Sequence, residues 1–290
     1  MPGNRCRSHR PRSQRPAFLI ADRQARHKGP STSAPELLHK TASSLGGVRD
    51  SAAPGGNRGV MRAVILAGGI GSRLRPYTLS LPKPLLPIGE KPILQIIVQQ
   101  LAQHGFSHLT LAVNHQADLF SAYFGDGRKW GVQITYSLER EALGTMGPLR
   151  LIDDLPPDFL VMNGDVLTDL DYGAAFRSHQ EQQRRFTIFA AARRQKVDFG
   201  VLHVDERGHL SGFEEKPDLE YIVSMGIYAV SREIVQKIPT GKPYGFDQLM
   251  LDCLADGVPV NVQIHDGYWL DIGRPDDYER ATEEWPKYAR

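Results

Sequence analysis

The stretch LAGGIGSRLRPYTLSLPKPLLPIG, from Leu66 to Gly89, constrains the fold of this chain most strongly. It continues from an apolar run, MRAVILA, and leads into an amphipathic run, EKPILQIIVQQLAQHG. Glycine permits tight turns and a close approach of the backbone to a ligand, whereas proline fixes φ and stiffens the chain. The pattern therefore predicts a buried strand, a glycine turn and a rigid cationic loop that leads into a helix.

Short apolar runs alternate with helical patterns around and after this stretch. Uniformly apolar strands joined by helices favour a mostly parallel sheet with helices on both faces. Beyond residue 185, the turn sequences DERG and DGYW indicate antiparallel additions to that sheet. Residues 61–290 are thus predicted to form one α/β domain with three layers. Its first strands are expected at residues 62–67, 108–114, 133–139 and 158–165, and its first helices at residues 91–104 and 117–123.

Residues 1–60 differ in composition from the rest of the chain. They contain eleven Lys and Arg against three Asp and Glu, a net charge of about +8, whereas the other residues carry about −6 of the total of +2. This segment has little apolar periodicity and cannot bury enough apolar surface to offset chain entropy, so we predict a disordered basic extension. Three origins stay open: a transit peptide, a basic arm that touches nucleic acid or membrane, or a segment upstream of a native start at Met61.

The composition of the remaining residues argues against several classes of function. Their mildly acidic charge offers no footprint for nucleic acid, and no run of about 18 apolar residues predicts a membrane span. The two cysteines, Cys6 and Cys253, have no spacing typical of a metal site or a disulfide framework, which favours a reducing compartment. We therefore expect a cytoplasmic protein that binds neither nucleic acid nor membrane.

A glycine-rich turn between a strand and a helix is typical of phosphate binding, because backbone N–H groups there point at an anion. The P-loop motif does not fit, since it needs Lys and Ser or Thr where the chain has Leu74 and Arg75. The dinucleotide fingerprint fails as well, because Leu74 replaces its third glycine. Arg73 and the proline-flanked Lys83 nevertheless favour a phosphate clamp over a plain strand-to-helix turn.

The same residues carry a family resemblance. The pattern L-A-G-G-x-G-[ST]-R-L-x-P-x-T-x-x-x-P-K-P-[LM]-[LV]-P is typical of the sugar nucleotidyltransferases, the NDP-sugar pyrophosphorylases. Leu66 to Pro87 match it at every specified position. The resemblance extends over most of the chain from Met61 to about Glu284. It implies a Rossmann-like, three-layer nucleotidyltransferase domain of the glycosyltransferase-A type, with a mostly parallel central sheet and antiparallel additions.

The resemblance implies that a sugar 1-phosphate attacks the α-phosphorus of a nucleoside triphosphate and that pyrophosphate leaves. Two anions must then be aligned and neutralised, which gives catalytic roles to Arg73 and Lys83. Mg²⁺ would be held by Asp165 and Asp271, although each aspartate alone is equally typical of a turn or a helix cap. The residues implied to bind the nucleotide are Leu66, Ala67, Gly68, Gly69, Gly71, Ser72 and Asn114.

The sugar side of the site is implied by two further segments. FGVLHVDERGHLSGFEEKP resembles the family segment that ends in E-K-P, so that Glu215 would hold sugar hydroxyls and Lys216 the sugar phosphate. YSLEREALGTMGPL resembles a sugar-binding loop, but Ala142 stands where a proline is common. Ser224 likewise stands where many relatives have Asn. The residues implied to bind the sugar phosphate are Glu141, Gly144, Thr145, Gly200, Glu215, Lys216 and Gly226.

The sequence LGTMG resembles the corresponding loop of mannose-1-phosphate guanylyltransferases and of short relatives in surface-polysaccharide gene sets. It favours GTP and mannose 1-phosphate as substrates, in nucleotide-sugar and polysaccharide biosynthesis. UTP or dTTP with glucose 1-phosphate, or another sugar 1-phosphate, stays an alternative, as does a non-catalytic regulatory subunit that binds sugar nucleotides. An NAD-type oxidoreductase is disfavoured by the missing third glycine alone. Association into a homo-oligomer stays open. Asp276 and Asp277 are interpreted as acids at the N-terminus of a helix.

Overall fold

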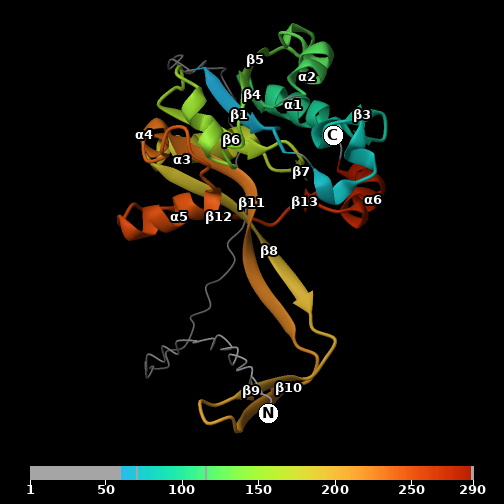
Figure 1. Cartoon of the computed structure of the whole chain (residues 1–290), viewed down its shortest axis with the longest axis vertical. Coiled ribbons are helices and arrows are strands. Elements are labelled where there is room, and N and C mark those ends of the chain that lie inside the picture. The colour runs from blue at the N-terminus through green and yellow to red at the C-terminus, as the bar shows by residue number, and fades with distance from the viewer. Residues whose placement is uncertain (1–59, 70, 115, 289–290) are drawn as a thin grey trace, which may run out of the picture. The chain divides into compact units, whose positions relative to one another are not determined.

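Residues 60–288, apart from 70 and 115, are described by the computed structural model of this chain (Figure 1). The basic extension predicted for residues 1–60 therefore lies outside the described residues, except for Val60. Cys6 also lies outside them, whereas Cys253 is a buried free thiol.

A seven-stranded sheet forms the centre of the fold, with the strand order β12-β8-β11-β6-β1-β4-β5. Four neighbouring pairs, β12–β8, β6–β1, β1–β4 and β4–β5, run parallel, whereas β8–β11 and β11–β6 run antiparallel. The predicted class, a mostly parallel sheet with antiparallel additions, is confirmed. The strands are β1 (Met61–Leu66), β4 (Phe106–Val113), β5 (Gln133–Leu138), β6 (Asp158–Asn163), β8 (Phe186–Lys196), β11 (Asp218–Ser231) and β12 (Asn261–His265).

The turn sequence DGYW leads from a parallel strand to an antiparallel one. β12 ends before the turn and pairs in parallel with β8. After the turn, β13 (Trp269–Asp271) pairs with β7 (Val166–Thr168) in a separate two-stranded sheet. The turn thus carries the chain from the large sheet to a small one. DERG, in contrast, closes the predicted antiparallel hairpin, between β9 (Val201–Val204) and β10 (Leu210–Glu214).

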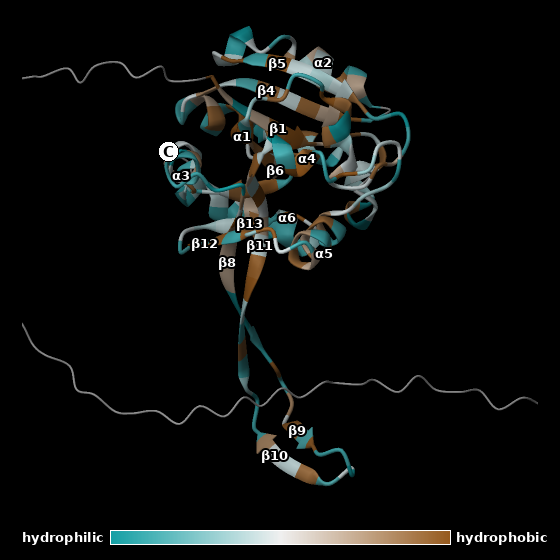
Figure 2. Ribbon diagram, turned by 90° about the vertical axis from the view of Figure 1, so that its left-hand side faces the viewer, coloured by the Kyte–Doolittle hydropathy of each residue, from teal (hydrophilic) through white to brown (hydrophobic). Residues whose placement is uncertain are grey.

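Helices cover both faces of the sheet, because its central strands are apolar on both sides. In β1, Ala63 and Ile65 pack into one core and Val64 into the other. Figure 2 shows the hydrophobic colouring of these central strands. No helix among the described residues is long and apolar enough to cross a membrane. The first core receives side chains from α1 (Ile93–Gln103), α2 (Ala117–Phe124), α3 (Tyr172–Glu181) and α6 (Pro275–Glu284), and the second from α4 (Arg232–Val235) and α5 (Phe246–Ala255).

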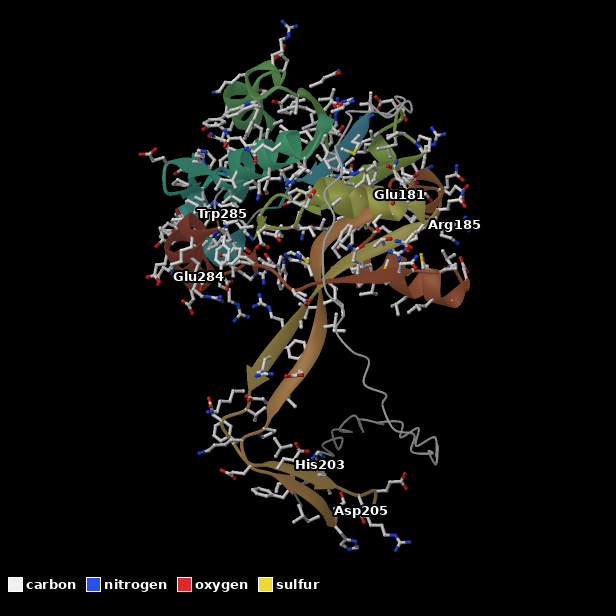
Figure 3. The ribbon with its side chains drawn as sticks, turned by 180° about the vertical axis from the view of Figure 1, so that it is seen from behind. Glu181, Arg185, His203, Asp205, Glu284 and Trp285 are labelled. Atoms are coloured by element: carbon white, nitrogen blue, oxygen red, sulfur yellow. The ribbon has the colours of Figure 1, made fainter. Side chains whose placement is uncertain are left out.

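Residues 192–224 form a long hairpin, here called the arm, that leads away from the large sheet (Figure 1). β8 and β11 pair with each other along the arm, whereas pairing with β12 stops at Ala191 and pairing with β6 begins only at Ile227. The β9–β10 hairpin forms its outer part, where Figure 3 labels His203 and Asp205. Large apolar side chains are exposed on the arm, including Phe199 and Phe213.

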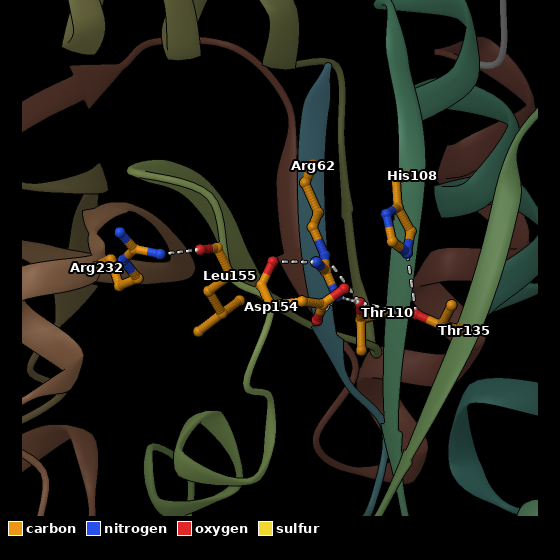
Figure 4. Close-up of polar contacts among 7 residues, drawn as sticks. All are labelled: Arg62, His108, Thr110, Thr135, Asp154, Leu155 and Arg232. Atoms are coloured by element: carbon orange, nitrogen blue, oxygen red, sulfur yellow. Dashed lines mark hydrogen bonds and ion pairs between the residues drawn. The ribbon is translucent and has the colours of Figure 1, made fainter. Parts of the chain in front are cut away.

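A buried arginine anchors the loop before β6 to the sheet (Figure 4). Arg62 is only 5% exposed, and its Nη2 donates to Thr110 Oγ1 at 2.8 Å. Its Nη1 donates to the backbone oxygen of Asp154 at 2.8 Å, while Nη2 lies 3.0 Å from the Asp154 carboxylate. This pairing satisfies a charge that would otherwise be costly to bury. Arg62 is therefore a structural cation near the amino end of β1, opposite the edge that carries the glycine turn.

Candidate active site

The glycine turn lies at the carboxyl end of the parallel strands, where open α/β sheets bind their ligands. Two backbone hydrogen bonds hold its first residues there: Ala67 donates to Ala112 O at 2.8 Å, and Gly164 donates to Leu66 O at 2.9 Å. The predicted nucleotide-binding residues between Leu66 and Ser72 that the structure describes therefore lie beside the ends of β4 and β6.

Gly71 lets the loop fold back on itself. Its φ of 64° is left-handed, and a Cβ placed on it would lie 3.1 Å from Thr78 Cγ2 and 3.2 Å from Lys83 Cβ. The Thr78 hydroxyl donates to Gly71 O at 2.8 Å and closes the turn. A side chain at Gly71 would thus separate the glycine turn from the segment that carries Lys83.

Lys83 lies between the two aspartates that the resemblance implies as metal ligands. It begins a short 3-10 helix, η3 (Lys83–Leu85), and is only 8% exposed. Its Nζ lies 2.5 Å from Asp165 Oδ2 and 4.0 Å from Asp271 Oδ1. Asp165 lies between β6 and β7, while Asp271 ends β13, and pairing of β13 with β7 holds the two close together. The structure therefore brings together three predicted site residues that are far apart in the sequence.

The electrostatics of this cluster favour a further cation. Burial, followed by the charge of Asp165, raises the pKa of Asp271 above its ordinary value, and the positive charges of Lys83 and Arg73 act in the opposite direction. Asp165 Oδ1 is buried and has no hydrogen-bond partner among the described residues. Such an oxygen is costly to bury without a ligand, so a metal ion would satisfy it.

The donor set suits magnesium in particular. Mg²⁺ is commonly held by one or two carboxylates together with substrate phosphates and water. Asp165 and Asp271 supply two such carboxylates. In the part of the chain that the structure describes, no group of three or more His, Cys, Asp or Glu side chains is arranged to hold a metal. The two aspartates would therefore need the substrate and water to complete the coordination.

Arg73 lies close to the same cluster. It belongs to η1 (Ser72–Leu74) and is exposed to solvent. A Cβ built on Gly273, two residues after Asp271, would lie 3.9 Å from Arg73 Nη1. Within residues 60–288 as described, Arg73 forms no salt bridge, so its guanidinium retains its donors for a phosphate.

A cleft of about 370 Å³ opens next to the glycine turn. Gly68 and Asn114 line one part of it, and the segment after β5, including Glu139 and Glu141, lines the other. The Asn114 amide donates to Gly68 O, and a Cβ on Gly68 would lie 2.9 Å from Glu139 Oε2. The absence of a side chain at Gly68 therefore leaves room for the Glu139 carboxylate beside the turn.

Sequence reasoning missed Glu139. Its backbone N–H donates to Val113 O at 2.8 Å, so it lies beside the end of β4, and its carboxylate also accepts from Leu143 N–H. One signal could have identified it: Glu139 directly follows an apolar strand, at the edge where the predicted Asn114 follows the neighbouring strand.

The predicted sugar-binding loop after β5 is braced against the segment before α5. Gly144 has a φ of 77°, and a Cβ there would lie 2.8 Å from Tyr244 O. Thr145 Oγ1 accepts from Phe246 N–H at 2.8 Å, which satisfies a backbone donor at the start of α5. Glycine is thus required at Gly144 for conformation, and the Thr145 hydroxyl already has a structural partner.

Gly226 lies in a bulge of β11. The register of β11 against β8 shifts between Ser224 and Ile227. Gly226 has a φ of 73°, and a Cβ there would lie 2.6 Å from Asn163 Nδ2. The Ser224 hydroxyl accepts from Gly226 N–H at 3.2 Å, a bond that stabilises the bulge.

Three predicted sugar-binding residues lie on the arm. A Cβ on Gly200 would lie 3.2 Å from Glu215 Oε2, so the structure brings Gly200 and Glu215 together. Lys216 follows in an unusual backbone conformation, with φ of 47°. In both Figure 1 and Figure 2 the β9–β10 hairpin lies apart from β13, the strand that Asp271 ends. The structure therefore does not bring Glu215 and Lys216 to the cluster of Lys83, Asp165 and Asp271.

The loops at the strand ends place the chain among α/β proteins that receive their ligand at the carboxyl edge of a mostly parallel sheet. Within that class, the family model described as Nucleotidyl transferase matches residues 62–287. The chain belongs to the nucleotidyl transferase family. This confirms the resemblance drawn from the loop, whereas the roles of the individual site residues stay predictions.

Named relatives differ in the nucleotide and sugar of their names. The chain is 36% identical over 241 residues to a UTP--glucose-1-phosphate uridylyltransferase of Synechocystis, covering 76% of this chain and 62% of the relative. It is 34% identical over 233 residues to a mannose-1-phosphate guanyltransferase of Yarrowia lipolytica, covering 77% and 63%. The chain thus spans less than two thirds of the length of these curated relatives.

A solved structure shares the fold. The crystal structure of HddC from Yersinia pseudotuberculosis, complexed with GMP-PN, superposes with a TM-score of 0.59 at 27% sequence identity. The match covers 78% of this chain and 100% of that chain.

Proposed function

We propose that the protein is a sugar-1-phosphate nucleotidyltransferase that transfers the guanylyl group of GTP to mannose 1-phosphate. The observation that carries the proposal is the cluster of Lys83, Asp165 and Asp271 beside the glycine turn, in a chain of the nucleotidyl transferase family. In the reaction, a phosphate oxygen of the sugar 1-phosphate forms a bond to the α-phosphorus. The bond between the α-phosphorus and its bridging oxygen breaks, and pyrophosphate leaves with the electron pair.

The attacking oxygen is already anionic, so the reaction needs no protein nucleophile. The protein must instead align two anions and neutralise the charge that develops on the transferred phosphate. The buried ammonium of Lys83 would contact the α-phosphate, and the exposed guanidinium of Arg73 would bind the departing pyrophosphate bidentately. Backbone N–H groups of the glycine turn would bind the remaining phosphate oxygens.

Asp165 and Asp271 would hold a divalent cation, and the buried, unpaired Oδ1 of Asp165 supports this assignment. Bound there, Mg²⁺ would act as a Lewis acid toward the phosphate oxygens. Until a cation binds, the ammonium of Lys83 offsets part of the repulsion between the two carboxylates.

Glu139 supports guanine as the base. Guanine presents two neighbouring donors, N1–H and the N2 amino group, to which a carboxylate can bind with both oxygens. Uracil and thymine present one N–H between two carbonyl oxygens, so a carboxylate there would face an acceptor. Glu139 lines the cleft beside the turn, and each carboxylate oxygen keeps a lone pair besides the bond to Leu143 N–H.

The choice of mannose 1-phosphate as the sugar substrate rests on the resemblance of the LGTMG loop and on the name of the Yarrowia relative. The name of the Synechocystis relative favours UTP with glucose 1-phosphate as the alternative. A non-catalytic regulatory subunit is disfavoured, because Arg73, Lys83, Asp165 and Asp271 are all present. The cytoplasmic location stays a prediction.

Pyrophosphate release from five nucleoside triphosphates, each paired with a panel of sugar 1-phosphates, tests the proposal. GTP with mannose 1-phosphate should give the highest kcat/KM. Glu139→Gln should lower kcat/KM for GTP by about tenfold to a hundredfold, since a charged hydrogen bond is lost, and should improve UTP or dTTP relative to GTP. Glu181→Gln, on the exposed end of α3, serves as the matched control. A wild-type preference for UTP or dTTP would contradict the choice of base, and no turnover with any pair would contradict the activity.

A further inference from the structure

We propose that Tyr278 is a positioning residue for the transfer reaction. It braces the cationic loop, the segment between β1 and β2 that carries Arg73 and Lys83, against the segment that carries Asp271. The inference rests on the proposed function, because it assigns a task in the transfer reaction to a residue whose contacts are with Pro87 and Tyr77. It concerns α6, the helix that follows Asp271 in the sequence.

Tyr278 contacts the cationic loop at two points. Its hydroxyl donates to Pro87 O at 2.7 Å. Its ring lies 5.3 Å from the ring of Tyr77, centroid to centroid, at an interplanar angle of 42°. Tyr77 begins η2 (Tyr77–Leu79), and Pro87 begins β2 (Pro87–Ile88). Lys83 lies between these two contacts in the sequence, so one side chain of α6 holds the loop on both sides of the lysine.

The start of α6 is itself tied to Asp271. The Asp277 carboxylate accepts from Gly273 N–H at 3.2 Å and from Arg274 N–H at 2.9 Å, which fixes the turn that follows Asp271. The same turn approaches Arg73, since a Cβ on Gly273 would lie 3.9 Å from Arg73 Nη1. The segment 271–278 therefore carries one carboxylate of the site and contacts both ends of the cationic loop.

The loop needs such a brace because regular structure contributes little to its stability. Among the described residues between β1 and β2, the chain forms only isolated 3-10 turns, and Arg73, Arg75 and Tyr77 are exposed. In-line transfer requires Lys83 and Arg73 to keep a fixed position relative to Asp271, and a displacement of about 1 Å can cost on the order of a hundredfold in rate. Tyr278 joins these parts of the site, because it belongs to the helix that follows Asp271 and contacts the loop that carries Lys83.

Two substitutions in the full chain test the proposal. Tyr278→Phe keeps the ring but loses the bond to Pro87 O, and should lower kcat by roughly five- to tenfold. Tyr278→Leu also loses the ring contact with Tyr77 and should lower kcat by on the order of a hundredfold. The KM values of both substrates should change little, because Tyr278 contacts neither. Tyr123→Phe is the matched control, since its hydroxyl donates to Gln95 Oε1 at 2.6 Å on the exposed surface of α2, and its kcat should stay at the wild-type value.

Hydrogen exchange of residues 72–88 supplies a readout that does not depend on turnover. Exchange there should be faster in both Tyr278 variants than in Tyr123→Phe, while the thermal midpoint of Tyr278→Phe stays close to that of the wild type. An unchanged kcat in Tyr278→Leu, or a change in KM alone, would overturn the proposal. If the wild type turns over no substrate pair, the proposed function fails, and unchanged exchange of residues 72–88 would then overturn the brace independently.

Discussion

Lys83 is a charged side chain held almost entirely inside the protein. Burying an ammonium is costly unless it is paired, and Asp165 at 2.5 Å provides the pair. The ion pair with Asp165 does not explain why Asp271 lies close by. Oδ1 of Asp271 is 4.0 Å from Lys83 Nζ, and the pKa of Asp271 is raised. A buried lysine ammonium between two carboxylates is better suited to a site that binds a charged ligand than to an ion pair that only stabilises the fold.

Arg73 offers a test at the scale of one side chain. Its contact should strengthen in the transition state, so Arg73→Ala should lower kcat roughly a hundredfold or more, a loss of about 3 kcal/mol. Arg73→Lys should rescue little, because a point charge cannot reproduce the bidentate fork. Steady-state kinetics with Arg128→Ala, an exposed arginine paired with Asp126, as the control decide this. A rise in KM with unchanged kcat would show that Arg73 binds the ground state instead.

His179 makes stability depend on pH away from the site. Its side chain is fully buried, and burial, with a smaller contribution from Arg184, lowers its pKa from 6.5 to about 4. Below pH 6.5, His179 therefore binds a proton in the unfolded chain, whereas in the folded chain it stays neutral until the pH approaches 4. The free energy of unfolding falls as the pH drops toward 4. The expected loss between pH 7 and pH 5 is about 2 kcal/mol.

Denaturant unfolding of the wild type and His179→Gln at several pH values measures this effect. All other ionisable groups are common to the two proteins, so the difference in slope isolates His179. The slope should be smaller in the variant, whatever its absolute stability. Equal slopes would mean that His179 is protonated in the folded protein near its ordinary pKa.

At the scale of elements, local patterns predicted most of the first half of the fold. The helix expected at residues 91–104 is α1, Ile93–Gln103, and the one expected at 117–123 is α2, Ala117–Phe124. Asp276 and Asp277 lie in the first turn of α6, as predicted. These features depend on local periodicity and on helix ends, which are written in short stretches of sequence.

Partners of strands and loops were harder to predict, because they depend on residues far apart in the chain. β12 pairs in parallel with β8, and a turn sequence carries no information about that choice. Glu139 was missed since its position beside Asn114 follows from the pairing of β4 and β5. The contact of Tyr278 with Pro87 likewise joins residues that no local pattern connects. The family resemblance predicted that Lys83, Asp165 and Asp271 belong to one site, which the spacing of these residues in the sequence could not have predicted alone.

The arm gives a prediction at this scale. If Lys216 binds the sugar phosphate, Lys216→Ala should raise the KM for the sugar phosphate about tenfold, the loss of one charged hydrogen bond, with little change in kcat or in the KM for the triphosphate. Because the β9–β10 hairpin lies apart from β13 in both views, such a result would also require the arm to bend toward the site during turnover. Lys196→Ala, which changes an exposed lysine at the end of β8 on the arm, is the control. An unchanged KM would mean that Lys216 does not contact the sugar phosphate.

In the whole molecule, the candidate site combines parts from both ends of the described chain. The cationic loop follows β1, the first strand, and Asp271 belongs to β13, the last. Contacts with α6 then close the arrangement from the C-terminal side. The disorder predicted for residues 1–60 from their composition concerns residues that, apart from Val60, lie outside the described part of the chain, and it stays a prediction.

We propose that this arrangement transfers a nucleotidyl group with the help of a divalent cation held by Asp165 and Asp271. The most direct test is mass-spectrometric detection of GDP-mannose formed from GTP and mannose 1-phosphate, with Mg²⁺ and after exhaustive chelation. Product should form with Mg²⁺, vanish on chelation and fall at least a hundredfold in Asp271→Asn, whereas Asp276→Asn, in the first turn of α6, should retain activity. Product that persists after chelation, or an active Asp271→Asn enzyme, would contradict the account.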